Sequence, residues 1–146
     1  MEQAQPSRVV VGVDGSEHSR LALAWAAEEA TIRDVGLDVV LAWTLLSQPG
    51  REQPKPDYGD ADARAVLEQL VADTLGNARP AELALRPIND LAARALIDAS
   101  EDAAIVVVGS RGLGGFRELL LGSVSAQVVR HARCPVVVVP GEERAP

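Results

Sequence analysis

Four short aliphatic runs constrain the fold of this chain more than any other feature. Each run consists only of Val, Ile and Leu, and none alternates with polar residues. The runs are residues 9–11, 39–41, 105–108 and 136–139. We expect each to be a strand buried on both faces, as parallel strands between two helix layers are. Leu83 and Leu85 mark a weaker fifth strand, whose alternating pattern places it nearer an edge of the sheet.

Helical patterns fill the intervals between these strands. Residues 19–32 are rich in Ala and Leu, and apolar residues recur at helical spacing from Ala63 and again from Ile88. Asn89 or Asp90 is a candidate N-cap for the helix that the second pattern predicts. A fourth helix is expected over residues 123–131. Strands that alternate with helices in this way predict a doubly wound α/β sheet.

The chain of 146 residues has the size of one domain, and it shows no internal repeat or domain boundary. We therefore expect residues 1–146 to form a single domain. Residues 44–59 contain three Pro and two Gly. We interpret them as a long, flexible surface loop.

Composition and charge exclude several classes of function. A net charge of −7 and an aromatic content of 3% argue against a non-specific nucleic-acid binder. Cys134 is the single cysteine, so neither an internal disulfide nor a zinc site is expected. Residues 1–7 lack the pattern of a signal peptide, and no apolar stretch approaches the ~18 residues of a membrane span. We expect a cytoplasmic protein without membrane contact.

The first stretch that suggests chemistry is Gly-Val-Asp-Gly-Ser at residues 12–16, where the first strand ends. Open α/β sheets bind ligands beyond the carboxyl ends of their strands. The carboxylate of Asp14 could hold ribose hydroxyls there, and it is the one candidate metal ligand. The alternative interpretation is a plain turn in which Ser16 caps the first helix.

The second stretch is rich in glycine and follows the strand at residues 105–108. Residues 109–115 contain Gly at four positions, and Gly122 and Ser123 follow at the start of a helix. Backbone N–H groups and the positive end of that helix predict an anion site. The alternative is a flexible surface loop. Neither a Walker loop nor a dinucleotide fingerprint fits, because the single lysine is Lys55 and the third fingerprint position is Arg117.

The spacing Gly109-x2-Gly112-x9-Gly122-Ser123 resembles the nucleotide-binding signature of the universal stress protein family. Residues 8–16 are similar to the opening strand and acidic tip of that family, and residues 120–139 to its closing helix and last strand. The resemblance covers about residues 8–140. It implies a Rossmann-like, five-stranded parallel sheet of order 3-2-1-4-5 with helices on both faces, of the kind that binds adenine nucleotides.

The resemblance also implies ATP as the ligand, together with Mg²⁺ or Mn²⁺, and a set of binding residues. These are Gly12, Val13, Asp14, Ala42, Val108, Gly109, Arg111, Gly112, Gly122, Ser123, Val124 and Ser125. Asp14 would hold the ribose, and Ala42, favoured over Trp43, would form a wall of the adenine pocket. Gly112, Gly122 and Ser123 would cradle phosphates, while Arg111 would meet phosphate or face water.

The resemblance leaves several functions open. The first is an ATP-binding regulatory protein of the stress response, and a second is a member that binds cyclic AMP. A third is a slow ATPase or autophosphorylating protein, with Ser110, Ser123 or Ser125 as acceptor; no efficient enzyme is expected. A fourth is a scaffold without ligand, which the retained glycine signature argues against. Family members dimerise through the last strand, so we expect a homodimer through residues 136–139.

Overall fold

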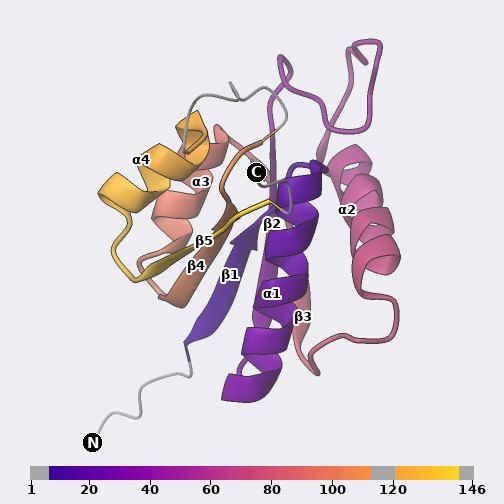
Figure 1. Cartoon of the computed structure of the whole chain (residues 1–146). Helices are drawn as coiled ribbons and strands as arrows, with labels where there is room; N and C mark the ends of the chain where they lie inside the picture. The colour runs from indigo at the N-terminus through magenta and orange to yellow at the C-terminus, as the bar shows by residue number, and fades with distance from the viewer. Residues whose placement is uncertain (1–6, 113–120, 142–146) are drawn as a thin grey trace, which may run out of the picture.

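The computed structural model describes residues 7–112 and 121–141 and contains a single parallel sheet within them (Figure 1). Its strands are β1 (Arg8–Gly12), β2 (Leu37–Trp43), β3 (Leu83–Asn89), β4 (Ala103–Gly109) and β5 (Val136–Val139). Its helices are α1 (Glu17–Arg33), α2 (Asp60–Leu75), α3 (Ala92–Ala99) and α4 (Ser123–His131). The strand order is β3-β2-β1-β4-β5, and all pairs are parallel. The doubly wound fold and its strand order are thereby confirmed.

Two helix layers enclose the sheet (Figure 1). Helices α1 and α2 cover one face, where Leu23 and Leu67 pack against Val9 and other strand residues. Helices α3 and α4 cover the opposite face, where Leu96 packs with Val10 and its neighbours. Successive strand residues therefore enter different cores, which explains why β1 and β4 show no polar alternation.

Strand β5 differs from the expectation of burial on both faces. All four of its valines are only half-buried. The strand is four residues long and pairs with β4 on one side, and the described residues place no strand along its other side. An edge position explains the exposure, because an edge strand is shielded by one neighbour instead of two.

The start of α3 also differs from the expectation. The helix begins at Ala92, and its N-cap is Leu91 rather than Asn89 or Asp90. Asn89 instead pairs with Trp43 as the last residue of β3. β3 contains Pro87, which its edge position tolerates, since half of the backbone groups of an edge strand have no partner strand. Strand pairing therefore extends over residues that the helical spacing had assigned to α3.

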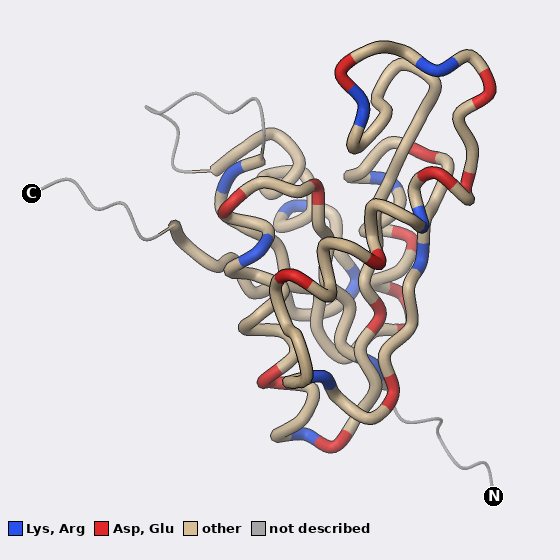
Figure 2. The backbone as a smooth tube through the Cα atoms, turned by 90° about the vertical axis from the view of Figure 1, so that its right-hand side faces the viewer, with Lys and Arg blue, Asp and Glu red and all other residues tan. Residues whose placement is uncertain are grey.

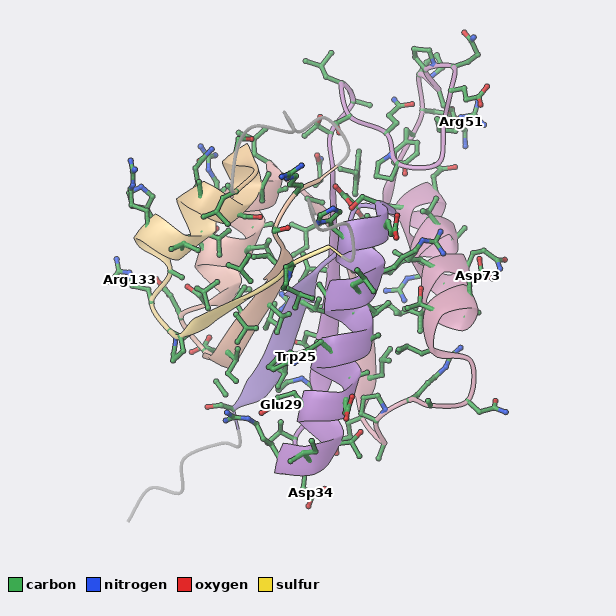
Figure 3. The ribbon with its side chains drawn as sticks, viewed as in Figure 1. Trp25, Glu29, Asp34, Arg51, Asp73 and Arg133 are labelled. Carbon is green, nitrogen blue, oxygen red and sulfur yellow. The ribbon has the colours of Figure 1, made fainter. Side chains whose placement is uncertain are left out.

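Helix α1 ends without a glycine. Asp34 adopts a left-handed conformation with φ of 56°, and its backbone N–H donates to the carbonyl oxygens of Ala30 and Thr31 (Figure 3). The N–H of Val35 also donates to Ala30, at 3.0 Å. These bonds satisfy carbonyl groups at the helix end and turn the chain toward β2.

Residues 44–59 project beyond the carboxyl end of β2 (Figure 1), and side-chain hydrogen bonds tie them together. The side chain of Gln48 accepts from the N–H of Lys55 at 2.7 Å and donates to its carbonyl at 2.9 Å. Tyr58 donates its hydroxyl to the carbonyl of Pro49 at 2.8 Å. Tyr58 also packs against Trp43, with ring centroids 5.4 Å apart. The flexibility of this loop stays a prediction, and these contacts define its shape.

Charged residues of both signs are interspersed along the chain (Figure 2). The most buried carboxylate is Asp38 on β2, which accepts from Arg8 at 2.6 Å and from Arg86 at 3.4 Å. This cluster lies at the amino end of the sheet, away from the strand ends where ligands bind in such folds. No helix in the described ranges is both long and apolar enough to cross a membrane.

Candidate functional site

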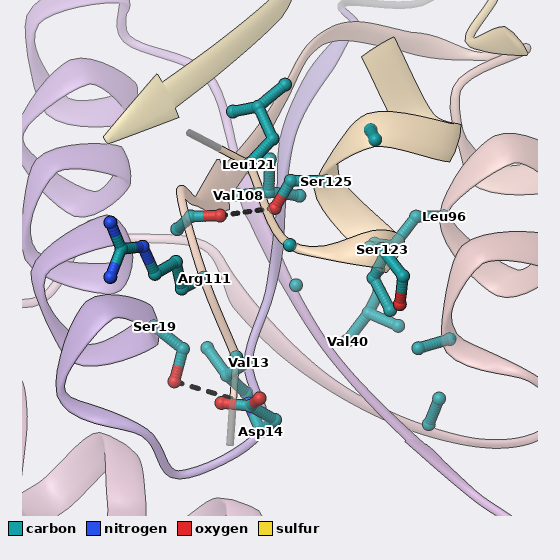
Figure 4. A pocket seen from close by; sticks show the side chains of 18 residues that line it. Val13, Asp14, Ser19, Val40, Leu96, Val108, Arg111, Leu121, Ser123 and Ser125 are labelled. Atoms are coloured by element: carbon teal, nitrogen blue, oxygen red, sulfur yellow. Dashed lines mark hydrogen bonds between the residues drawn. The ribbon is translucent and has the colours of Figure 1, made fainter. Parts of the chain in front are cut away.

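A cavity of about 570 Å³ lies at the carboxyl ends of β1, β2 and β4, beside the first turn of α4 (Figure 4). Its volume falls within the range of small-molecule sites. All twelve residues that the sequence nominated lie in its wall. They are Gly12, Val13, Asp14, Ala42, Val108, Gly109, Arg111, Gly112, Gly122, Ser123, Val124 and Ser125. Gly114 and Gly115 of the glycine-rich stretch lie outside the described residues.

The turn after β1 fixes the carboxylate of Asp14. Its Oδ1 accepts a hydrogen bond from the N–H of Ser16 at 2.9 Å, and its own N–H donates to the Ser19 hydroxyl at 3.2 Å (Figure 4). Gly15 adopts φ of 89°, a conformation that side chains disfavour. Ser16 caps α1 by accepting from the N–H of Ser19. The same turn thus both caps the helix and places Asp14 at the cavity.

The turn after β4 is held by hydrogen bonds to its carbonyl groups. The hydroxyl of Ser125 donates to the carbonyl of Gly109 (Figure 4), and the N–H of Gly122 donates to the carbonyl of Ser110 at 2.7 Å. Two acceptors of this turn are therefore already satisfied. Because these carbonyl oxygens already accept hydrogen bonds, they would repel an anion in the cavity less strongly.

The first turn of α4 adds donors to the same wall. The helix begins at Ser123, and its N-cap, Gly122, makes no side-chain capping bond. The first N–H groups of a helix lack partners within the helix, and they carry the positive end of its dipole. Val124 and Ser125 belong to this turn and line the cavity. The arrangement suits a phosphate or another anion.

Gly112 allows the turn after β4 to approach the turn after β1, and Gly122 allows the start of α4 to approach Arg111. A Cβ atom at Gly112 would lie 2.6 Å from Oδ2 of Asp14, and a Cβ atom at Gly122 would lie 3.3 Å from Cα of Arg111. Only glycine fits at the first position without displacing the carboxylate. The sequence motifs around residues 14 and 112 therefore form one site, although they are far apart in the chain.

Several wall residues were missed by the sequence reasoning. They are Ser19, Val40, Ala92, Leu96, Leu121 and Ala126. Val40 could have been found, because it precedes Ala42 by two residues and so faces the same side of β2. Leu96 could not, because its place depends on how α3 crosses β1. A Cβ atom at Gly12 would lie 2.6 Å from Cδ1 of Leu96, so that helix packs directly on the strand end.

Ala42 and Trp43 face opposite sides of the sheet. Ala42 lines the cavity, whereas Trp43 is buried against Tyr58 and donates its indole N–H to Asp60 at 2.7 Å. The preference for Ala42 as a wall residue agrees with this arrangement. Trp43 instead fastens the loop of residues 44–59 to the start of α2.

The three candidate phosphate acceptors occupy different positions. Ser110 is absent from the cavity wall and lies 2.9 Å from Nδ1 of His18, measured from its hydroxyl oxygen. Ser125 lines the cavity, but its hydroxyl donates to a backbone carbonyl. Ser123 is exposed at the wall. Within the described part of the chain, no three His, Cys, Asp or Glu side chains gather as a metal site.

Comparison with known proteins shows the family to which the chain belongs. The model of the universal stress protein family matches residues 6–140. The chain belongs to that family. A universal stress protein from Mycolicibacterium smegmatis is 36% identical over 99% of this chain, which covers 52% of that relative. The chain thus spans about half the length of the curated relatives that it matches.

Two solved universal stress protein structures carry nucleotides. One, in complex with cAMP, is 29% identical to this chain with a TM-score of 0.70, and the match covers 92% of this chain and 96% of that one. The other, from Archaeoglobus fulgidus in complex with dAMP, is 27% identical with a TM-score of 0.67, covering 92% and 98%. Both likenesses extend over nearly the whole of each chain.

Proposed function

We propose that this universal stress protein binds an adenine nucleotide in the cavity, with ATP as its ligand, and acts as a nucleotide-dependent regulator of the stress response. The observation that carries the proposal is the meeting of two loops in one cavity. One loop presents the carboxylate of Asp14, and the other presents Gly112, Gly122 and the first turn of α4. A nucleotide needs both an acceptor for its ribose hydroxyls and donors for its phosphates.

The apolar part of the cavity suits the base. Val40, Ala42, Val108 and Leu96 supply aliphatic surface from two strands and α3. Ligand pockets are lined mainly by such side chains, with a few polar groups to fix orientation.

The polar part suits the phosphates. Glycines at 112 and 122 permit close approach of the backbone, and the unpaired N–H groups at the start of α4 supply charge complementarity. Arg111 lines the wall and adds a cation. The single carboxylate of the wall, Asp14, is assigned to the ribose, so Mg²⁺ or Mn²⁺ would be held mainly by phosphate oxygens, and direct coordination by Asp14 is the alternative role.

A cAMP-binding function is the second candidate. It is favoured by the relative in complex with cAMP, which is 29% identical over 92% of this chain. The two ligands differ in charge and in the state of the ribose 3′ hydroxyl, which is free in ATP and esterified in cAMP. A side-by-side titration therefore separates them.

Catalysis is at most slow in this proposal. Phosphoryl transfer needs a positioned nucleophile or base beside metal-held phosphates. Of the three candidate acceptors, Ser123 is the one that lines the cavity without donating its hydroxyl to Gly109 or lying against His18. Autophosphorylation, if it occurs, should therefore fall on Ser123.

A homodimer through β5 is part of the same proposal. Its four half-buried valines form the edge of the sheet, and pairing with a second copy would cover them. Covering an apolar edge strand in this way removes a surface that otherwise favours aggregation. Nucleic acid and membrane are not among the proposed partners.

Calorimetric titration of nucleotide-free protein with ATP, cAMP and AMP, each with Mg²⁺, tests the proposal. We expect an ATP dissociation constant on the order of micromolar, equivalent to about 8 kcal/mol of binding free energy. Gly122→Glu places a bulky anion against the phosphates and should abolish binding while the circular dichroism spectrum stays unchanged. Tighter binding of cAMP would favour the second candidate, and absence of all binding would overturn the proposal.

A further inference from the structure

His18, which lies outside the cavity wall, contacts the turn that the proposed function assigns to the phosphates. Its ring nitrogen Nδ1 lies 2.9 Å from the hydroxyl of Ser110, a residue 92 positions away. His18 belongs to the first turn of α1, and Ser110 directly follows β4. Ser110 is 9% exposed and His18 is half-buried, so the hydrogen bond is partly buried.

Glycines on both sides allow the ring and backbone of His18 to fit there. A Cβ atom at Gly141, just after β5, would lie 2.6 Å from Nε2 of the ring. A Cβ atom at Gly109 would lie 2.8 Å from the carbonyl carbon of His18. The start of α1 is thus packed closely against the ends of β4 and β5.

Ser110 connects four elements. Its N–H donates to the carbonyl of Val139 on β5 at 2.9 Å, and its carbonyl accepts from Gly122 at the start of α4 at 2.7 Å. Its hydroxyl meets His18 on α1. Its chain neighbours Gly109 and Arg111 both line the cavity, although Ser110 does not. Ser110 therefore holds the turn from the side that faces away from the cavity.

We propose that His18 is a positioning residue for the nucleotide site. Through Ser110, it fixes the backbone of the turn at residues 109–112, whose approach to the phosphates depends on a defined geometry. This inference rests on the proposed function. A direct catalytic role does not fit, because Ser110 is nearly buried and outside the cavity wall, so the pair of side chains cannot reach a bound ligand.

Two substitutions of His18 separate hydrogen bonding from packing. His18→Asn keeps a polar atom near the position of Nδ1, whereas His18→Leu keeps bulk and removes the hydrogen bond. We expect the ATP dissociation constant to rise about fivefold in the leucine variant, as for loss of one ordinary hydrogen bond. The asparagine variant should stay within about twofold of the unsubstituted protein. His131→Leu, at the exposed end of α4, is the matched control and should have no effect.

Gly141→Ala tests the same contact from the strand. The added methyl group should displace the ring of His18 and raise the dissociation constant about as much as His18→Leu. In a His18→Ala background the methyl group meets no ring, so Gly141→Ala should cause no further loss. A loss of equal size in both backgrounds would show that Gly141 acts independently of His18 and would count against the inference.

Hydrogen exchange of the Gly122 amide, which bonds to Ser110, gives a readout that needs no nucleotide. It should be faster in His18→Leu and normal in His18→Asn, with unchanged circular dichroism in both. If the leucine variant does not fold, Ser110→Ala removes the bond from its other side. Absence of nucleotide binding to the unsubstituted protein overturns the proposed function, while the exchange data still test positioning. Normal affinity and exchange in the leucine variant, or failure of asparagine to restore them, overturns the inference.

Discussion

Oδ2 of Asp14 faces Gly112 so closely that a Cβ atom at that glycine would lie 2.6 Å from it. Gly112→Ala should therefore displace either the carboxylate or the turn. We expect ATP affinity to fall at least about tenfold, equivalent to about 1.4 kcal/mol. The unfolding midpoint should change little, because residue 112 is exposed. Calorimetric titration measures the affinity, and thermal unfolding measures the stability.

Gly59→Ala is the matched control for this substitution. Gly59 has an extended backbone, and a Cβ atom there would meet nothing within 4 Å. It caps α2, so a small loss of stability is expected without any change in affinity. Equal losses of affinity in both variants would contradict the role of the Asp14–Gly112 approach.

We expect the carboxylate of Asp14 to accept hydrogen bonds from the ribose hydroxyls. Asp14→Ala should weaken ATP binding, whereas 2′,3′-dideoxy-ATP, which lacks the hydroxyl donors, should bind the alanine variant and the unsubstituted protein with similar affinity. Hydrogen bonds to a charged group contribute about 1.5–3 kcal/mol, so a loss of roughly ten- to a hundredfold is expected. A loss of the same size for both nucleotides would assign Asp14 to metal or loop structure instead.

The hydrogen bond from Ser125 to Gly109 should contribute to stability. The serine is 4% exposed, so Ser125→Ala leaves the carbonyl of Gly109 without this buried donor. We expect a loss of about 1–3 kcal/mol in the free energy of unfolding, measured by urea titration. Ser123→Ala, at an exposed position of the same helix turn, should change it by less than about 0.5 kcal/mol. If Ser125→Ala lowers the free energy of unfolding no more than Ser123→Ala does, the hydrogen bond to Gly109 contributes little to stability.

Lys55 and Asp62 hold the loop of residues 44–59 to α2 through a contact of 2.6 Å. The hydrogen bond to Asp62 raises the pKa of Lys55 above its ordinary 10.5, and the same bond lowers the pKa of Asp62 below 3.8. The ion pair is therefore lost as pH rises through the raised lysine pKa or falls through the lowered aspartate pKa. Between these limits it should persist.

Asp62→Asn should consequently lower the pKa of Lys55 toward 10.5. Lys55 is the single lysine of the chain, so magnetic resonance of its side chain can be followed without overlap from other lysines. Asp57→Asn should lower the same pKa by less, because Asp57 acts only through its charge and is a weaker cause of the shift. An unchanged lysine pKa in Asp62→Asn would refute the pairing.

The proposed dimer makes β5 sensitive to charge. Val138→Lys places a cation on the half-buried edge strand, and we expect the protein to sediment as a monomer. Val129→Lys, at a valine of α4 that is 48% exposed, is the control and should leave the dimer intact. A dimer that survives Val138→Lys, or a monomer before substitution, would exclude this interface.

The strands were predictable because each aliphatic run lies between two helix layers. The aliphatic pattern of Val136 to Val139 alone overestimated the burial of β5, whereas the order 3-2-1-4-5 implied by the family resemblance places that strand at an edge, as observed. The sequence reasoning also failed at Asn89, where pairing with Trp43 extended β3 into a helical pattern. Local spacing cannot report such long-range pairing.

The sequence led to more of the cavity wall than of its surroundings, and nucleotide binding by that wall stays a prediction. The glycine spacing from Gly109 to Gly122 led to wall residues because those glycines follow one strand and precede one helix. Leu96 was missed, as was the contact of His18 with Ser110, because each depends on how elements distant in the chain pack together.

Ala42 and Trp43 are adjacent, yet one lines the cavity and the other lies beneath the opposite helix layer. The indole is therefore shielded from a ligand by the strand itself. The fluorescence of Trp43 should therefore change little when a ligand merely occupies the cavity. A spectral shift of Trp43 on addition of nucleotide would instead signal that the loop bearing Tyr58, or the start of α2 at Asp60, had moved against the ring.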